Sequence, residues 1–198
     1  MDKHRQPKSP LDYVRAYIAK SVSILQNISE EEIVSLIALL KEARDYKGQV
    51  LLCGNGGSAT TATHLASELG KEASLGQPKR FRVLSLTDNI SWLTSLANDL
   101  DYSQIFVEQL KNYGQAGDLL LAFSSSGNSV NVLEAVTWAN ENKLITIGIT
   151  GANGGKLAKL STHSIHVASN HTGHIQEGHF LIQHLISYYF LETNPQLT

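Results

Sequence analysis

The stretch "QVLLCGNGGSATTATHLASELG" covers residues 49–70 and reads as an apolar run, a glycine turn and a helical segment. This order is typical of a strand, loop and helix in a buried parallel sheet. Gly54, Gly56 and Ala59 also fit G-x-G-x-x-A, a dinucleotide-binding signature. His64 and Glu68 lie four residues apart and instead suggest a metal site or an acid/base pair. The stretch therefore predicts an α/β fold and leaves the kind of site open.

Further short apolar runs alternate with helical segments along the rest of the chain. Including the first run, the expected strands cover residues 49–53, 81–86, 118–123, 144–149 and 164–168. Continuous apolar runs of this length are typical of parallel strands that are buried on both faces. We therefore expect an α/β three-layer sandwich around a five-stranded parallel sheet, of the flavodoxin-like or Rossmann-like type. Ligands of such sheets bind beyond the carboxyl ends of the strands.

Two helices are expected before this sheet. Apolar residues recur at helical spacing between residues 11 and 28, and Ser29 with Glu32 forms a capping box for a second helix. These helices either pack on the sheet or mediate assembly. Residues 1–10 lack an apolar segment and are expected to form a disordered tail, followed by a single domain over residues 11–198.

The composition restricts the class of protein. Apolar residues make up 42% and charged residues 17% of the chain, which indicates a globular protein. The net charge of −2 gives no support for a nucleic-acid or membrane-surface partner. Cys53 is the only cysteine, which argues against a disulfide framework and favours a reducing cytoplasm. No apolar stretch reaches the roughly 18 residues that a membrane-spanning helix requires.

The segment "SSSGNS" at residues 124–129 follows an expected strand and precedes a helix expected from about residue 130. The hydroxyls of Ser124, Ser125, Ser126 and Ser129 surround a glycine there. With the unpaired N–H groups and positive dipole of a helix N-terminus, they would form an uncharged phosphate cradle. The G-K-[ST] ending of a nucleotide P-loop is missing, so a sugar monophosphate suits the segment better. A turn with a helix cap is the structural alternative.

The second candidate site combines the His64 and Glu68 pair with the last helix, expected from about residue 172. Gln176 and His184 on that helix are about 12 Å apart along the axis and about 80° around it. They could meet one ion only by leaning strongly toward each other, or else the ligands come from two subunits. A surface His–Glu pair and ordinary core histidines remain alternatives. An apolar stripe is expected to bury this helix: Ile175, Ile182, Leu185, Ile186 and Tyr189.

From about residue 11 to its end, the chain resembles the phosphoheptose isomerase (sedoheptulose 7-phosphate isomerase) family of the SIS domain superfamily. The matching motifs are GNGGSA at 54–59, His64 with Glu68, AND at 97–99, GD at 117–118, SSSGNS at 124–129, TG at 150–151, GGKLA at 154–158, and IQE at 175–177 followed by His184. The number of motifs and their shared order make the resemblance specific.

This resemblance implies a cytoplasmic aldose–ketose isomerase that converts sedoheptulose 7-phosphate to heptose 7-phosphate through a cis-enediol. Glu68 would be the catalytic base and His184 its acid/base partner. One zinc ion per subunit would be held by His64, Glu68, Gln176 and His184. The enzyme would be a homotetramer with active sites at subunit interfaces.

The resemblance also implies a set of substrate contacts: Asn55, Gly56, Gly57, Glu68, Asn98, Asp99, Ser124, Ser125, Ser126, Ser129 and Gln176. The chain departs from the family at Gly173 and His174, where an acidic residue and an arginine usually stand. These departures leave the exact sugar phosphate open.

Two other functions remain open. A non-catalytic SIS module would bind a sugar phosphate or a protein partner, although such a module could lose His64 or Glu68 freely. A dinucleotide-binding oxidoreductase would need a ribose-binding acid about 20 residues after its glycine motif. Asp88 follows Gly54 by 34 residues, which is late, and the serines at 124–129 have no role in that scheme.

Overall fold

The computed structural model describes residues 9–193. Its elements in chain order are α1 (Pro10–Leu25), α2 (Glu30–Asp45), β1 (Gln49–Gly54), α3 (Gly57–Ser67), the π-helical turn η1 (Glu68–Glu72), β2 (Arg82–Ser85), α4 (Ile90–Asp99), the 3₁₀ turn η2 (Tyr102–Gln104), α5 (Val107–Tyr113), β3 (Leu119–Ser124), α6 (Val130–Glu141), β4 (Ile145–Gly151), α7 (Gly155–Leu160), β5 (His163–Val167) and α8 (Thr172–Glu192). All five expected strands are therefore present.

The five strands form one parallel sheet in the order β2-β1-β3-β4-β5. This is the flavodoxin-like order, in which the chain winds from β1 outward in both directions. The carboxyl ends of β1 and β3 are neighbours, because Gly54 pairs with Phe123 in the register. The expected sheet type is confirmed, and the loops after β1 and β3 meet at one edge of the sheet.

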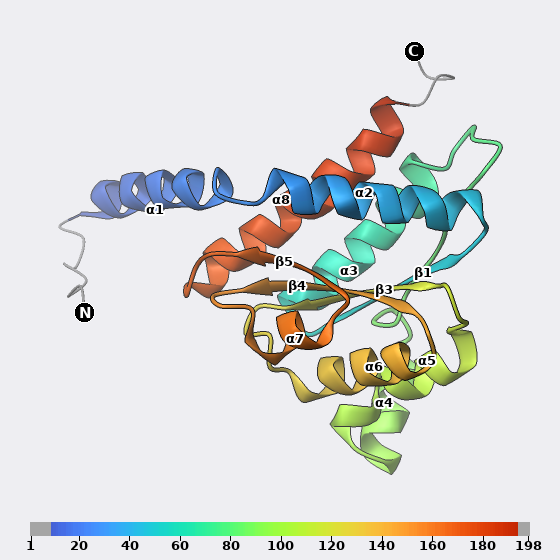
Figure 1. Cartoon of the computed structure of the whole chain (residues 1–198). Helices are drawn as coiled ribbons and strands as arrows, with labels where there is room; N and C mark the ends of the chain where they lie inside the picture. The colour runs from blue at the N-terminus through green and yellow to red at the C-terminus, as the bar shows by residue number, and fades with distance from the viewer. Residues whose placement is uncertain (1–8, 194–198) are drawn as a thin grey trace.

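Helices cover both faces of the sheet, with α2, α3 and α8 on one side and α5, α6 and α7 on the other (Figure 1). Alternate side chains of each strand enter opposite cores. Val50 and Leu52 pack into the core under α2, α3 and α8, whereas Leu51 and Cys53 pack under α5 and α6. Burial of both faces explains why the central strands β1, β3 and β4 read as apolar runs. The edge strands β2 and β5 are partly exposed, so the expected burial on both faces is wrong for them.

The two N-terminal helices begin at serines. Ser9 accepts a hydrogen bond from the first turn of α1, so the helix starts inside the segment expected to be a tail, of which residues 1–8 lie outside the described residues. Ser29 accepts from the main-chain N–H of Glu32 at 3.2 Å, as a capping box requires, but its hydroxyl donates to Glu31. The expected cap of α2 is therefore present in its serine half.

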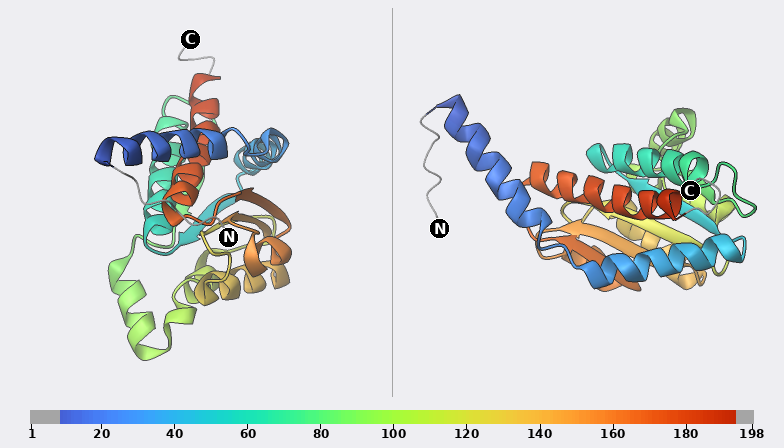
Figure 2. Two further views of the ribbon diagram at one scale, coloured as in Figure 1. Left: turned by 90° about the vertical axis from the view of Figure 1, so that its left-hand side faces the viewer. Right: turned by 90° about the horizontal axis from the view of Figure 1, so that it is seen from above.

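Helix α1 projects from the body of the chain and contacts it mainly through α8 (Figure 2). Its apolar residues at helical spacing lie largely in the open: Leu11, Val14, Ile18 and Val22 are 48–57% exposed. A single chain therefore leaves this apolar face of α1 uncovered. No helix within residues 9–193 is long and apolar enough to cross a membrane.

Helix α8 packs on the sheet, and the residues on its buried face differ in part from the expected apolar stripe. Ile175, Ile182 and Ile186 are buried as expected, but Leu185 and Tyr189 are 45% and 43% exposed, which corrects the prediction. The buried face is instead completed by polar residues, which a search for apolar positions passes over: His174, His179, Gln183 and Ser187.

Candidate active site

A cavity of about 510 Å³ opens at the carboxyl ends of β1, β3 and β4, beside the start of α8. Its walls contain eight of the expected substrate contacts: Asn55, Gly56, Gly57, Ser124, Ser125, Ser126, Ser129 and Gln176. Loops at this edge of a parallel sheet are where ligands of α/β proteins bind. The fold therefore gathers the phosphate-loop serines, the glycine loop and Gln176 around one space.

The serine loop, residues 124–129, presents hydroxyls to this cavity. The Oγ atoms of Ser124 and Ser129 lie 3.1 Å apart, and Ser124 is buried. Ser129 occupies the N-cap position of α6, yet its side chain makes no capping hydrogen bond. Its hydroxyl therefore does not serve the helix, which disfavours the reading of this loop as a turn with a cap.

The serine loop is held in place by the segment that runs from the end of β4 into α7. The main-chain N–H of Leu157 donates to the Gly127 carbonyl at 2.9 Å, and that of Gly151 donates to the Ser125 carbonyl at 3.2 Å. Gly127 has φ +63°, and a Cβ there would lie 2.7 Å from the carbonyl carbon of Gly154. Only glycine fits this conformation and this close approach without strain. The serine loop therefore interlocks with the end of β4 and the start of α7 through main-chain contacts.

Gln176 reaches the cavity by passing close to the start of α3. A Cβ on Gly57 would lie 2.7 Å from Cδ of Gln176, so the amide rests where a side chain would otherwise be. Gly57 is thus required by the position of Gln176 as well as by the turn. The contact joins the glycine loop of the opening stretch to α8.

Asn55 is held by two residues that the sequence did not single out. Its Nδ2 donates to Oδ1 of Asn131 at 2.8 Å, and Nδ2 of Asn131 donates to Oδ1 of Asn55 at 2.9 Å. The Tyr102 hydroxyl donates to the same Oδ1 of Asn55 at 3.0 Å. The only sequence signal for Asn131 was its place just after the serine loop, in the first turn of α6.

His64, Glu68 and His184 lie together on the outer side of α3 and α8. Nε2 of His64 is 3.5 Å from Oε1 of Glu68, so the two side chains share a helix face as their spacing predicts. Helix α8 brings Nε2 of His184 to 3.3 Å from Nε2 of His64. Glu68 stands where α3 passes into the π-helical turn η1, a feature that often marks functional sites.

The donor set at this place is chemically suited to zinc, which binds imidazole nitrogen and carboxylate oxygen. Oε2 of Glu68 is buried without a hydrogen-bond partner. However, no group of three or more His, Cys, Asp or Glu side chains within residues 9–193 is arranged to hold a metal ion. The amide of Gln176 lies at Gly57 in the cavity. One chain therefore does not assemble all four expected ligands.

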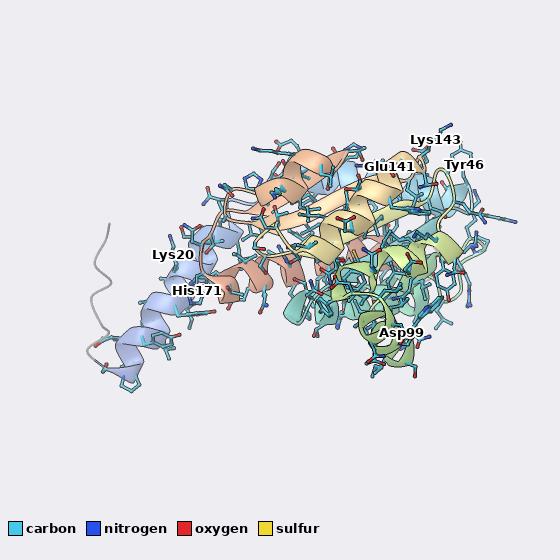
Figure 3. All side chains as sticks on the ribbon, turned by 90° about the horizontal axis from the view of Figure 1, so that it is seen from below. Lys20, Tyr46, Asp99, Glu141, Lys143 and His171 are labelled. Atoms are coloured by element: carbon cyan, nitrogen blue, oxygen red, sulfur yellow. The ribbon has the colours of Figure 1, made fainter. Side chains whose placement is uncertain are left out.

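Asn98 and Asp99 lie outside the cavity of their own chain. Both are exposed at the end of α4, where Nδ2 of Asn98 donates to Oδ1 of Asp99 at 2.8 Å. Figure 3 shows Asp99 at the end of α4, which projects from the body of the chain (the α4 projection), well away from His171 at the start of α8. Their expected contact with substrate stays a prediction.

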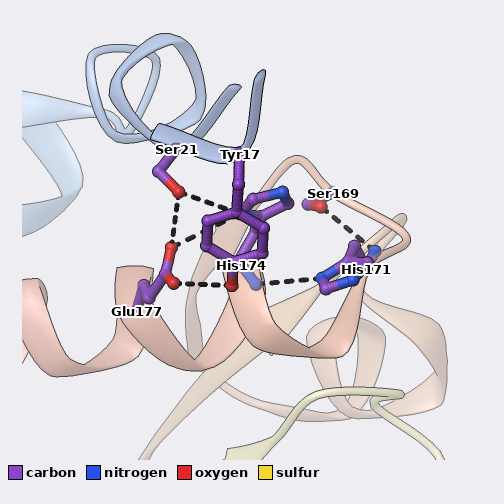
Figure 4. Close-up of polar contacts among 6 residues, drawn as sticks. All are labelled: Tyr17, Ser21, Ser169, His171, His174 and Glu177. Carbon is purple, nitrogen blue, oxygen red and sulfur yellow. Dashed lines mark hydrogen bonds and ion pairs between the residues drawn. The ribbon is translucent and has the colours of Figure 1, made fainter. Parts of the chain in front are cut away.

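The start of α8 is tied to α1 by a cluster around Glu177 (Figure 4). The Glu177 carboxylate accepts from the hydroxyls of Tyr17 at 2.7 Å and Ser21 at 2.8 Å, and Nδ1 of His174 lies 3.3 Å away. Burial raises the pKa of Glu177, but these three partners outweigh burial and hold the pKa below its usual value. The bond to Glu177 raises the pKa of Tyr17 to about 12.

This cluster explains the departure at residues 173 and 174. A Cβ on Gly173 would lie 2.7 Å from the Tyr17 hydroxyl oxygen, so the missing side chain makes room for the tyrosine. His174 is buried between α1 and α8 and also contacts the Ser21 hydroxyl at 3.0 Å. The two residues therefore serve the joint between α1 and α8 in this chain.

The fold agrees with comparisons to known proteins. The SIS domain family matches residues 16–151, so the chain is an SIS domain protein. It is 37% identical over 180 residues to the phosphoheptose isomerase of Aneurinibacillus thermoaerophilus, covering 88% of this chain and 90% of the relative. It is 38% identical over 181 residues to that of Sulfurimonas denitrificans, covering 88% and 91%.

A solved structure gives the same result. The phosphoheptose isomerase of Neisseria gonorrhoeae superposes with a TM-score of 0.85 at 33% sequence identity, covering 93% of this chain and all of the other. Within the SIS domain proteins, the chain belongs to the phosphoheptose isomerase family.

Proposed function

We propose that the protein interconverts an aldose and a ketose phosphate, with sedoheptulose 7-phosphate as the ketose and heptose 7-phosphate as the product. The observation that carries the proposal is the cavity at the sheet edge, where four serines, Asn55 and Gln176 converge. Uncharged hydroxyls at a helix N-terminus suit a phosphate monoester. The similarity of the chain to phosphoheptose isomerases supports the choice of sugar.

The reaction moves a proton between C1 and C2 through a cis-enediol. Glu68 acts as the base: its carboxylate removes a proton from C1 of the ketose and returns it to C2. His184 protonates O2 as the enediol forms and accepts the proton of O1 as the aldehyde forms. The buried, unpartnered Oε2 of Glu68 and the nearby imidazoles support these roles.

The active site is completed between subunits of a homotetramer. Neither Glu68 nor His184 lines the cavity that holds the serine loop in a single chain. The exposed apolar residues of α1, and Leu185 on α8, provide surface that a second subunit would cover. Asn98 and Asp99, exposed on the α4 projection, would then reach a cavity of a neighbouring subunit. The enzyme would work in the cytoplasm.

His64, Glu68, Gln176 and His184 would hold one zinc ion per subunit, and the set would be completed on assembly. Zinc supplies a Lewis acid that polarises a carbonyl oxygen. The imidazole and carboxylate donors of the α3 and α8 face fit this ion in type.

The test is to incubate the purified protein with sedoheptulose 7-phosphate and to measure the aldose product, with and without added zinc. We expect product that disappears after chelation and returns with zinc. Absence of aldose under both conditions would contradict the isomerase. Tight binding of the sugar phosphate without any turnover would instead support a binding module.

A further inference from the structure

We propose that Asn131, assisted by Tyr102, is a positioning residue that fixes the Asn55 amide as a hydrogen-bond donor toward the cavity. The inference rests on the proposed function and adds the role of two residues outside the catalytic pair. It follows from the hydrogen bonds that surround Asn55.

The orientation of the two amides is decided by a main-chain donor. An asparagine pair that exchanges two hydrogen bonds could be turned over as a unit without losing either bond. The main-chain N–H of Val132 can only donate, and it is shared between the Ser129 carbonyl at 3.1 Å and Oδ1 of Asn131 at 3.0 Å. An NH2 group in the place of Oδ1 would set two donors against each other. This atom is therefore the oxygen, and the amide orientation of Asn55 follows from it.

The oxygen of Asn55 is then fully used. It accepts from Nδ2 of Asn131 at 2.9 Å and from the Tyr102 hydroxyl at 3.0 Å, which occupies both lone pairs. One N–H of its Nδ2 donates to Asn131, and the second N–H takes no part in these bonds. Asn55 lines the cavity, so it can offer a ligand there only a donor, which suits a phosphate or sugar oxygen.

The arrangement also joins three segments that are distant in sequence: the loop after β1, the turn η2 and the first turn of α6. Asn131 is 2% exposed and lies in the first turn of α6, two residues after the serine loop, whereas Asn55 is 76 residues earlier, in the loop after β1. Tyr102 comes from η2, beyond the α4 projection. Asn131 therefore sets the spacing between the serine loop and the donor of Asn55, and Tyr102 holds the amide through its oxygen.

The test places Asn131→Ala and Tyr102→Phe in the wild-type and Asn55→Ala backgrounds. In the wild type we expect KM for sedoheptulose 7-phosphate to rise about tenfold for Asn131→Ala and about threefold for Tyr102→Phe, with kcat within about twofold. In the Asn55→Ala background each added substitution should change KM by less than about twofold, because the amide that these residues position is already absent. Equal KM effects in both backgrounds, or none in either, would overturn the proposal.

Asn140→Ala is the matched control for Asn131→Ala. Asn140 lies at the other end of α6 and makes two side-chain bonds, to the Leu160 carbonyl at 2.9 Å and from the Thr146 hydroxyl at 2.8 Å. Its loss should lower stability without changing KM. If Asn131→Ala does not fold, Tyr102→Phe keeps the test, since it removes only the hydroxyl of a residue that is 57% exposed.

Calorimetric titrations with sedoheptulose 7-phosphate and with inorganic phosphate separate this inference from the proposed function. Wild-type binding without turnover would contradict the isomerase, yet the affinities of the variants would still decide the role of Asn131. Binding of neither titrant to the wild type would overturn both proposals.

Discussion

The cavity at the sheet edge and the His64, Glu68 and His184 face of α3 and α8 are built in different ways. The glycine loop and the serine loop of the cavity each begin at a strand end. The serine loop is fixed by main-chain hydrogen bonds from Gly151 and Leu157. The α3 and α8 face is joined by side-chain contacts, and its fourth expected ligand, Gln176, lies in the cavity. Under the proposed function, the cavity of one chain would bind the phosphate, whereas the chemistry would require the assembled protein.

The largest expected effect separates the two regions directly. Glu68→Gln keeps the size of the side chain but removes the base, so kcat should fall by about a thousandfold. The cavity does not include this residue, so affinity for inorganic phosphate should stay within about twofold. Steady-state kinetics and calorimetry measure the two quantities on the same preparation.

Glu72→Gln provides the control, since Glu72 lies at the end of the same π-helical turn and pairs with Lys71 at 2.6 Å. This change should leave kcat unaltered. Undiminished turnover in Glu68→Gln would remove Glu68 from the mechanism, and a parallel loss of phosphate affinity would show that the two regions are not separate.

The second largest effect is a loss of folding stability at low pH. It should disrupt both regions together, because both contain residues of α8. His179 is 1% exposed between α8 and the sheet, and burial lowers its pKa from 6.5 to about 4, opposed only by the main chain of Thr150. In the unfolded chain His179 binds a proton below about pH 6.5, whereas in the folded chain it binds one only below about pH 4. Stability is thus fully present above pH 6.5 and is lost as the pH falls, by about 2 kcal/mol at pH 5.

Urea unfolding at pH 7.5 and pH 5 checks this linkage. The drop in unfolding free energy between the two pH values should shrink in His179→Gln, whatever the stability of that variant at pH 7.5. His163→Gln is the control, because His163 is exposed on β5. An equal drop in the wild type and His179→Gln would show that another group causes the acid loss.

The smallest effect tests the cavity alone. Ser129→Ala removes one hydroxyl that caps no backbone group, so KM should rise about fivefold while kcat stays unchanged. Ser35→Ala removes a hydroxyl that donates to the Glu31 carbonyl on α2, and it should change neither constant. A fall in kcat with constant KM for Ser129→Ala would assign this serine to the chemical step.

The fold could be read from the sequence because its signals are local. The apolar runs around residues 49–53 and 118–123 became β1 and β3, since strands buried on both faces need no alternation. The four-residue spacing of His64 and Glu68 correctly predicted a shared helix face. The serine loop also lies where a strand followed by a helix predicted it.

The rest depends on contacts between distant residues. The hydrogen bonds between Asn55 and Asn131 join residues that are 76 positions apart, and no local sequence pattern predicts them. Leu185 and Tyr189 fit an apolar stripe, yet the pattern does not say whether the same chain covers them. The sequence also cannot say which chain brings Gln176 to the other three expected ligands.

The space that Gly173 leaves for Tyr17 has a consequence for related sequences. The two positions lie at opposite ends of the chain, yet a side chain at 173 and the tyrosine hydroxyl would compete for one volume. A relative with an acidic residue at 173 would have to turn the side chain at 17 away, carry a smaller residue there or seat α1 differently. We therefore expect the residues at 17 and 173 to change together among relatives, which an alignment of these two positions would test.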